Sequence, residues 1–233
     1  KYLPEHCTGA IVVTDYITFP DLNSGRVTRD YRPTKLLPLN LNLDRDFGWF
    51  VGAYLAEGNA TAGMVCISNL NDDYINNAKR FITDLGLDFN EQKHHRGFSD
   101  SRDFIVNSSL LSRFILKICG SGSDNKFVPE FAYSAKEEFV SGLLRGYFDG
   151  DGNITTSRRM IRVSSNSEEL LDGIKLLLTR FGIFASKSKD RKQDYLIIPY
   201  KYAPIFLEKI GSDIEYKRNA LIILTEFANK TSD

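Results

Sequence analysis

The chain has 233 residues, of which 42% are apolar and 26% are charged, an ordinary balance for a globular protein with a sizeable core. It contains no run of about 18 apolar residues, and its opening residues lack the charged-then-apolar order of a signal peptide, so the sequence predicts no membrane partner. The charges of thirty basic and thirty acidic side chains cancel, so the formal net charge is zero. This neutrality counts mildly against a nucleic-acid partner unless basic residues gather on one face.

The cysteines Cys7, Cys66 and Cys119 are odd in number, far apart and free of any CxxC spacing. A zinc site or a disulfide framework is therefore not expected. Free thiols are typical of a reducing compartment, so we expect a cytoplasmic or nucleoid location, with an organelle left open.

Residues 1–46 are predicted to be an N-terminal extension or linker. Residues 9–19 have the apolar, β-branched composition of a strand, and residues 21–35 are loop-like and moderately basic. Nothing in these residues indicates a function.

Two later segments are alike. FGWFVGAYLAEGN (47–59) and FVSGLLRGYFDGDGN (139–153) are both apolar helical runs that end in an acid, a glycine and an asparagine. Each is followed by two short alternating strands, and then by a helix that opens on Asn71 or Ser167 and closes on Gly86 or Gly182. Two more strands and a short helix complete each copy.

The pattern predicts two repeats, 47–138 and 139–233, each ordered helix, strand, strand, helix, strand, strand, helix. A terminal helix over 215–230 is added to the second repeat. A repeat of this length is a domain-sized unit, too long for a solenoid.

Small residues form a stripe on each repeated helix. Glycine inside a helix costs about 1 kcal/mol relative to alanine, so its presence there needs a reason. The four-residue spacing of Gly52 with Ala56, and of Gly146 with Gly150, puts small residues on one side of each helix and lets two helix backbones approach closely. We therefore predict that the two helices pack against each other along these stripes.

If the helices pack in this way, the acids at their ends, Glu57 and Asp151, converge. Two neighbouring carboxylates repel each other, and a divalent cation removes the repulsion. Hard oxygen ligands without a nearby His or Cys favour Mg²⁺ over zinc. The simpler interpretation is a helix cap. That interpretation suits Asp149, which lies about 200° round the helix from Asp151. Its side chain is therefore expected to face away from the other helix, as a cap or a solvated group.

These residues resemble the LAGLIDADG family. FVGAYLAEG (50–58) and LRGYFDGDG (144–152) match the nine-residue motif at its third, eighth and ninth positions. They depart from it at Phe50, at Arg145 and in having Glu57 in place of Asp. The resemblance implies an α+β fold with pseudo-twofold symmetry: an αββαββα unit occurs twice, and antiparallel saddle-shaped sheets flank two central packed helices.

The resemblance also implies a homing endonuclease: a monomer that cuts both strands of double-stranded DNA with Mg²⁺, for which Mn²⁺ is expected to substitute. The motif acids Glu57 and Asp151 are the implied metal ligands. The family places a basic residue near each active centre, which here points to Lys126 and Lys217, although most lysines are merely solvated. Such a lysine stabilises developing charge or orders the attacking water.

A sheet that reads DNA presents polar and basic side chains at alternate positions. Solvated faces are the simpler interpretation of such side chains. The expected DNA-contacting residues are Asn69, Lys93, Arg96, Arg102, Arg158, Arg159, Arg162, Ser164, Ser165, Lys187, Lys189, Arg191 and Lys192. The second repeat is richer in Arg and Lys than the first, which predicts an asymmetric target.

Two alternatives stay open beside the endonuclease. An RNA-splicing maturase or a non-cleaving DNA-binding protein could keep the same fold, although intact acids in both motifs favour cleavage. The stretch before Glu57 also resembles the entry to an intein endonuclease domain. The chain shows no terminal His-Asn junction and no Thr-x-x-His block, so self-splicing by this chain is not expected.

Overall fold

The computed structural model describes residues 10–12, 37, 40–96, 99–189 and 193–230. The first half contains α1 (Arg45–Glu57), β3 (Gly58–Ala60), β4 (Val65–Ser68), α2 (Asp72–Asp84), β5 (Asn90–Arg96), β6 (Ser99–Val106) and α3 (Ser109–Cys119). The second half contains α4 (Glu137–Asp151), β7 (Asn153–Thr155), β8 (Met160–Ser165), α5 (Glu168–Thr179), β9 (Ser186–Lys189), β10 (Asp194–Pro199) and α6 (Ala203–Lys209), followed by α7 (Glu215–Lys230). The predicted order of elements is confirmed in both halves.

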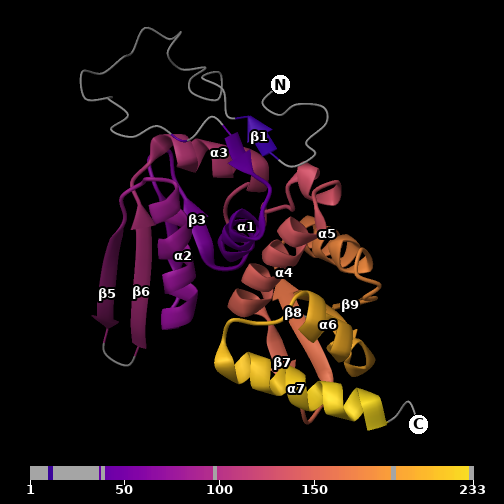
Figure 1. Cartoon of the computed structure of the whole chain (residues 1–233). Coiled ribbons are helices and arrows are strands. Elements are labelled where there is room, and N and C mark those ends of the chain that lie inside the picture. Colours follow the sequence, from indigo (N-terminus) through magenta and orange to yellow (C-terminus); the bar gives the residue numbers. More distant parts are fainter. Residues whose placement is uncertain (1–9, 13–36, 38–39, 97–98, 190–192, 231–233) are drawn as a thin grey trace, which may run out of the picture.

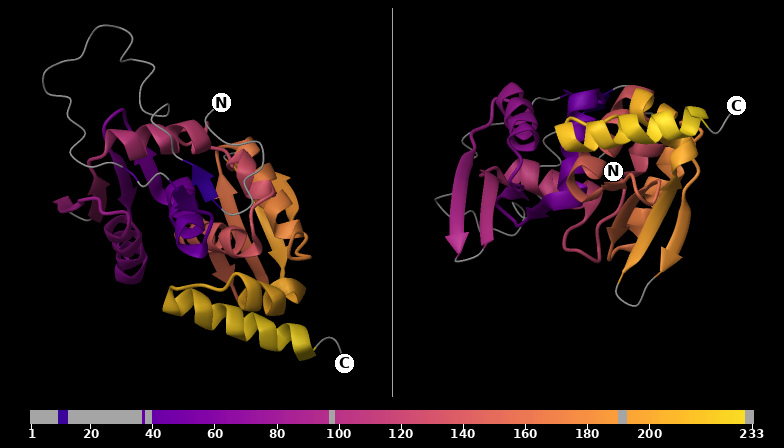
Figure 2. Two further views of the ribbon diagram at one scale, coloured as in Figure 1. Left: turned by 45° about the horizontal axis from the view of Figure 1, so that its top comes forward. Right: turned by 90° about the horizontal axis from the view of Figure 1, so that it is seen from below.

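The two halves carry equivalent antiparallel sheets, with strand orders β3-β4-β6-β5 and β7-β8-β10-β9. The sheets lie on either side of the central helices α1 and α4 (Figures 1 and 2). The α+β, pseudo-twofold fold class predicted from the sequence is therefore confirmed. A short pairing of β1 (Ala10–Val12) with β2 (Asn40–Asn42) precedes α1.

Side-chain capping explains where the second helix of each half begins. The side chain of Asn71 accepts a hydrogen bond from the backbone of Tyr74, and the hydroxyl of Ser167 accepts one from Leu170. Both caps satisfy amide groups that a helix start leaves without a partner. In each half this helix packs on one face of its sheet, so the opposite face remains accessible.

The helix pair α1–α4 is as close as backbone contact allows. A Cβ on Gly52 would lie 2.0 Å from the carbonyl oxygen of Leu143, and one on Gly146 would lie 2.2 Å from that of Trp49. Gly48 and Gly142 make the same kind of approach one turn earlier, to Phe139 and Arg45. Only glycine fits at such distances. This explains why glycine occupies these helix positions despite its low helix propensity.

Aromatic rings fill the end of this pair that lies away from the two acids. Phe47 stacks on Phe81, Phe114 and Phe131 and meets Phe139 edge to face.

Cys119 is a buried free thiol and Cys66 a half-buried one, while Cys7 lies outside the described residues. None of the described helices is long and apolar enough to cross a membrane.

Candidate metal and nucleic-acid site

The acids Glu57 and Asp151 stand at adjacent ends of α1 and α4. A Cβ added to Gly150 would meet Ala56 Cβ at 2.5 Å and Glu57 Cγ at 3.1 Å, so the side chain of Glu57 reaches the last turn of α4. The glycine stripe therefore brings together two carboxylates that lie far apart in the sequence.

The chain leaves both helices immediately after these acids. Gly58 and Gly152 both have extended backbones and negative φ values. Their requirement is steric, because a Cβ would lie 2.5 Å from the carbonyl oxygen of Tyr54 in the first copy and 2.3 Å from that of Phe148 in the second. Each acid is thus held where its helix meets the first strand of a sheet.

Both carboxyl groups are harder to ionise than usual. Partial burial raises the pKa of Glu57, and burial together with the nearby charge of Glu57 raises the pKa of Asp151 to about 7. Asp151 is solvent accessible, so its carboxyl group is only partly desolvated by the surrounding protein. An arrangement that disfavours two negative charges in this way is stabilised by an added cation.

One buried lysine caps each motif helix. Lys126 Nζ donates to the carbonyl oxygens of Tyr54 (2.9 Å) and Leu55 (3.1 Å) at the end of α1. Lys217 Nζ donates to those of Phe148 (3.0 Å) and Asp149 (2.6 Å) at the end of α4. The carbonyls of Tyr54 and Phe148 also accept from the backbone N–H of Gly58 and Gly152, so each lysine adds a second donor at the last turn of its helix. The negative end of the helix dipole favours a cation there.

The two lysines and the two acids form one electrostatic cluster. Burial lowers the pKa of Lys126 and of Lys217, while the charges of Glu57 and Asp151 act in the opposite direction on both. Their formal charges cancel. In the part of the chain that the structure describes, no three His, Cys, Asp or Glu side chains gather in a group that could hold a metal ion. Any cation here would rest on the two carboxylates and on oxygens from outside the protein.

Asn69 directly follows β4 and Ser165 is the last residue of β8, at matching positions in the two halves. Asn69 Nδ2 donates to Glu57 Oε1 at 3.4 Å, and its own side-chain oxygen accepts from the backbone of Asn71. Ser165 accepts in the same way from the backbone of Ser167. These two residues therefore connect the strand ends to the caps of α2 and α5, and Asn69 also touches the acid of the first motif.

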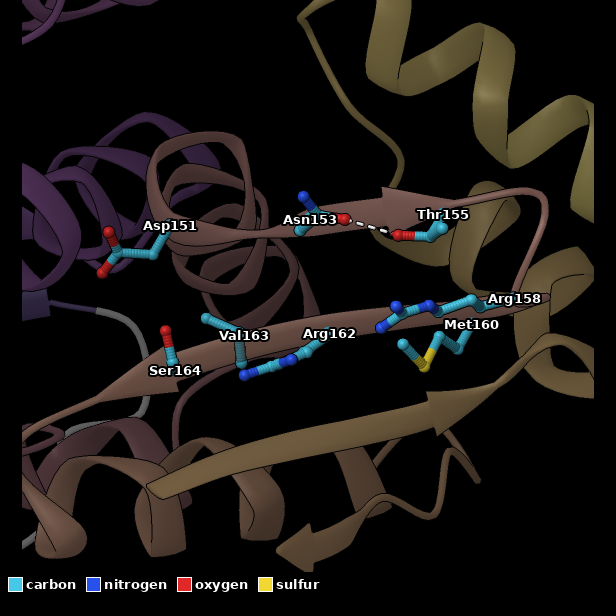
Figure 3. A pocket seen from close by; sticks show the side chains of 8 residues that line it. All are labelled: Asp151, Asn153, Thr155, Arg158, Met160, Arg162, Val163 and Ser164. Carbon is cyan, nitrogen blue, oxygen red and sulfur yellow. Dashed lines mark hydrogen bonds between the residues drawn. The ribbon is translucent and has the colours of Figure 1, made fainter. Parts of the chain in front are cut away.

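A groove of about 470 Å³ runs from Asp151 along the accessible face of the second sheet. Figure 3 shows Asp151 at one end of the groove, Asn153 of β7 and Arg162 of β8 in its middle, and Thr155 of β7 toward its other end. The remaining lining residues are Arg158, Met160, Val163 and Ser164. The Arg162 guanidinium lies 4.0 Å from the ring centroid of Tyr195, which holds the arginine over the sheet by a cation–π contact.

The structure separates the remaining basic residues from this groove. Lys187 lies opposite Leu196, a buried residue of the helix-covered face, and bonds Glu168 and Asp172 of α5. Lys189 follows the same alternation and lies opposite Asp194. The expectation that these two lysines share the face of Arg162 is therefore wrong, because the strand register places both on the opposite face, where Lys187 bonds α5 and the exposed Lys189 pairs with Asp194.

The same register applies in the first half. Lys93 lies opposite Arg102, whose buried guanidinium bonds Glu91 and Asp72 on the helix-covered face. Arg102 thus works inside the protein, contrary to the expectation of an open DNA-facing side chain. Arg159 packs over Phe227 and Tyr200. The side chain of Arg96, together with Arg191 and Lys192, lies outside the described residues.

Several residues of the site were missed from the sequence. Asn153 lines the groove, and its counterpart Asn59 pairs with Cys66 as Asn153 pairs with Arg162. The repeated Gly-Asn after each acid was the signal for both asparagines. Tyr195 carried no such signal. Asp149 was expected to be capping or solvated. It faces away from the helix pair as predicted, but it is buried, and its pKa rises to about 6 because burial disfavours its charge.

Comparisons with known proteins agree with this geometry. Residues 138–211 match the family model of a LAGLIDADG-like domain. The whole chain is 42% identical to a segment of the DNA-directed RNA polymerase subunit Rpo1C of Methanocaldococcus jannaschii. A DNA polymerase of Thermococcus hydrothermalis is 27% identical over 77% of the chain. The chain spans only 28% and 10% of the lengths of these two relatives.

Solved structures share the fold. The homing endonuclease I-DmoI matches with a TM-score of 0.58 at 13% identity, over 72% of this chain and 96% of that one. Full-length DUF199/WhiA matches with a TM-score of 0.59 at 18% identity, over 82% of this chain and 64% of that one. Together with the two duplicated sheets around a glycine-packed helix pair, these matches show that the chain has the LAGLIDADG fold and that residues 138–211 match a LAGLIDADG-like domain.

Proposed function

We propose that this chain is a site-specific endonuclease that hydrolyses both strands of a long, asymmetric double-stranded DNA target with a divalent metal. The observation that carries the proposal is the convergence of Glu57 and Asp151 at one point, with a buried lysine on each side and an accessible sheet face on each flank. A likeness to I-DmoI, which has been crystallised with its DNA and Mn, supports it.

The residues present suit a hard divalent cation. Carboxylate oxygens are the ligands that Mg²⁺ prefers, and Mg²⁺ is commonly bound by one or two carboxylates together with phosphate oxygens and water. In this proposal Glu57 and Asp151 hold the metal, Mg²⁺ or in its place Mn²⁺. When bound, the metal lowers the pKa of water and stabilises charge on the transferred phosphate.

The protein's own groups position the DNA and balance its charge. Lys126 and Lys217 are fixed by helix carbonyls, so they can face developing negative charge without reorganising. Arg158 and Arg162 line the groove that begins at Asp151 and give the second sheet a cationic patch for phosphate or base contact. Ser164 lines the same groove, and Ser165 follows it at the end of β8. Asn69 orients Glu57 in the first half.

The proposed domain division follows the duplication, with repeats at 47–138 and 139–233. The single chain supplies both halves, so a monomer is sufficient for cleavage. The relatives support an inserted element: an RNA polymerase subunit, a translation initiation factor and a DNA polymerase each match this chain over a small part of their own length. A shared segment in proteins of different kinds is what an intein-borne or otherwise mobile endonuclease gene produces.

A second candidate is a maturase or a DNA-binding protein that does not cut. The lysine contacts are compatible with this candidate, because an ammonium group that caps a helix has a structural role that does not require catalysis. The net charge of zero also provides little unspecific attraction to phosphate.

One experiment distinguishes the candidates. A randomised double-stranded library is incubated with the protein in Mg²⁺, cut ends are captured and sequenced, and the recovered site is cloned into a plasmid. The endonuclease should linearise that plasmid in Mg²⁺ and leave it intact in EDTA. Retention of a specific sequence on the protein without any cut ends would support the second candidate and overturn the first.

A further inference from the structure

The turn between α6 and α7 is tied to α4 by a buried acid. Asp149 Oδ1 accepts a hydrogen bond from the hydroxyl of Ser212 at 2.5 Å, and Oδ2 accepts one from the backbone N–H of Asp213 at 2.9 Å. Arg145 adds a bond to the Ile210 carbonyl at 2.6 Å and an ion pair with Asp213 at 2.9 Å. These contacts fix the turn over 211–214 against the last two turns of the motif helix.

Lys217 depends on this turn for its position. It lies in the first turn of α7, only a few residues beyond Ser212, and its Nζ reaches three successive carbonyls, of Phe148, Asp149 and Gly150. The Ser212 hydroxyl, which donates to Asp149, also accepts from the backbone of Ile214 just before α7. Two hydrogen bonds therefore lead from the Asp149 carboxylate through Ser212 to the backbone of Ile214, and Lys217 follows in the first turn of α7.

The first half achieves the same lysine position by other means. The residue two places before Glu57 is Leu55, where the second half has Asp149 two places before Asp151. The loop before Lys126 is held by Tyr54, whose hydroxyl donates to the Gly120 carbonyl at 2.7 Å. The carbonyl of Lys126 itself accepts from Ser167 at 2.6 Å. Among the described contacts, a carboxylate holds the turn that carries the lysine in the second half, whereas a tyrosine hydroxyl holds the corresponding loop in the first.

We propose that Asp149 is a positioning residue that holds the Lys217 ammonium at the end of α4, and through it supports cleavage of one of the two DNA strands. The placement of Lys217 stands on the contacts of this chain alone, and the consequence for cleavage rests on the proposed function. Asp149 bonds neither Asp151 nor the groove residues in the described structure, so it acts on the chemistry only through Lys217.

The test compares two substitutions and one control. Asp149→Leu installs the first-half residue and removes both acceptors. Asp149→Asn keeps an acceptor for the Asp213 N–H and can donate to the Ser212 oxygen, so it should preserve the turn. Ser141→Ala is the matched control, because its hydroxyl also bonds from α4 to the α6 region, at the Lys209 carbonyl, yet does not touch the turn over 211–214.

The first measurement needs no DNA. The Lys217 side chain is followed by NMR through its ¹³Cε and ammonium signals, assigned with a Lys217→Arg variant. In the parent protein and in the Asn and Ser141→Ala variants, the ammonium should stay protected from exchange with solvent. In Asp149→Leu the protection should be lost while the Lys126 signal is unchanged. Continued protection of Lys217 in a folded Asp149→Leu variant would overturn the positioning role.

The second measurement uses a target labelled on each strand with a different dye. Asp149→Leu should slow cleavage of one strand by about tenfold or more and of the other by less than about twofold, so nicked DNA accumulates. A merely structural loss would slow both strands alike, and that result would overturn the proposal. If the parent protein cuts no DNA, the proposed function fails by itself, and the NMR result still decides the role of Asp149.

Discussion

The two halves of this molecule share a frame and differ in what they place on it. Strand pairing makes the positions equivalent: Asn59 lies opposite Cys66 in the first half, and Asn153 lies opposite Arg162 in the second. On the next pair of strands, Ser68 lies opposite Asp103 in the first half, and Ser164 lies opposite Tyr195 in the second. The accessible face beside Glu57 is therefore neutral to acidic, and the face beside Asp151 is cationic and aromatic.

This comparison indicates which features the duplication constrains. The glycine contacts, the lysine caps and the short Asx- or Ser-type turns before α2 and α5 occur in both halves, because the helix pair and its acids require them. The side chains on the two accessible faces differ, as expected if each face contacts a different half of the proposed DNA target. Two unlike faces on one frame are consistent with the asymmetric DNA target proposed above.

The largest expected effect tests whether the two acids form one functional centre. Asp151→Asn keeps the size of the side chain but removes a charged metal ligand, so cleavage of both strands should fall by about a thousandfold or more. Glu57→Gln should have an effect of similar size. Specific DNA binding, measured by gel shift in Ca²⁺, should persist in both variants.

Asp172→Asn is the control for these two, because Asp172 is an exposed acid that bonds Lys187 on the helix-covered side of the sheet. It should cut like the parent protein. Full double-strand cutting by Asp151→Asn would remove the metal-ligand role from the proposal and leave the two halves related by fold alone.

The next effect concerns stability and tests the symmetry of the helix pair. Gly52→Ala and Gly146→Ala each place a methyl group about a bond length too close to a carbonyl of the opposite helix, so the helices must separate. We expect each to lower the free energy of unfolding by about 3 kcal/mol, measured by urea denaturation.

Gly63→Ala is the matched substitution at an open position, where a Cβ meets nothing within 4 Å. It should change the free energy of unfolding by less than about 1 kcal/mol. If Gly52→Ala were as harmless as Gly63→Ala, the close approach of α1 and α4 would not be the feature that selects glycine in the motifs.

A smaller effect separates the two faces of the second sheet. Arg162→Ala removes a guanidinium from the groove beside Asp151, whereas Lys187→Ala removes an ammonium already engaged by Glu168 and Asp172. We expect Arg162→Ala to weaken binding of the selected target about tenfold or more, and Lys187→Ala to change it by less than about twofold. Equal losses in a fluorescence-anisotropy titration would contradict the assignment of faces.

The sequence was sufficient to predict the frame. Helical periodicity, caps and the spacing of Gly52 with Ala56 and Gly146 with Gly150 predicted the element order and a packed helix pair, because these signals are local. The family resemblance pointed to Lys126 and Lys217, and the structure places both at the ends of the motif helices.

The faces of the outer strands could not be predicted from the sequence. In β9, Ser and Lys alternate without an apolar residue to mark the core side, so only the register against Leu196 decides where Lys187 points. Asp149 was misjudged for a related reason. Its partners Ser212 and Asp213 lie more than 60 positions further along the chain, and no local sequence pattern predicts these contacts.

The smallest effect is a pH dependence that arises in the second half. Asp151 has a pKa of about 7 in the folded protein, against about 4 for an unperturbed carboxyl group. Between these values the folded state binds more protons than the unfolded state, so stability in EDTA should decrease as the pH rises from 5 to 7.5. Asp149, with a pKa of about 6, adds a change of the same sign. Because Asp151 is solvent accessible, we expect only a small decrease in the urea midpoint.

Asp151→Asn should make this decrease smaller, because an amide stays neutral throughout and resembles the protonated acid. Adding Mg²⁺ to the parent protein at pH 7.5 should raise the midpoint, since a ligand that binds the folded state stabilises it, and should leave the variant almost unchanged. A midpoint that increases between pH 5 and pH 7.5 in EDTA would show that the site tolerates both charges without a cation. In that case the electrostatic reason for a metal at the meeting point of the two halves would be lost.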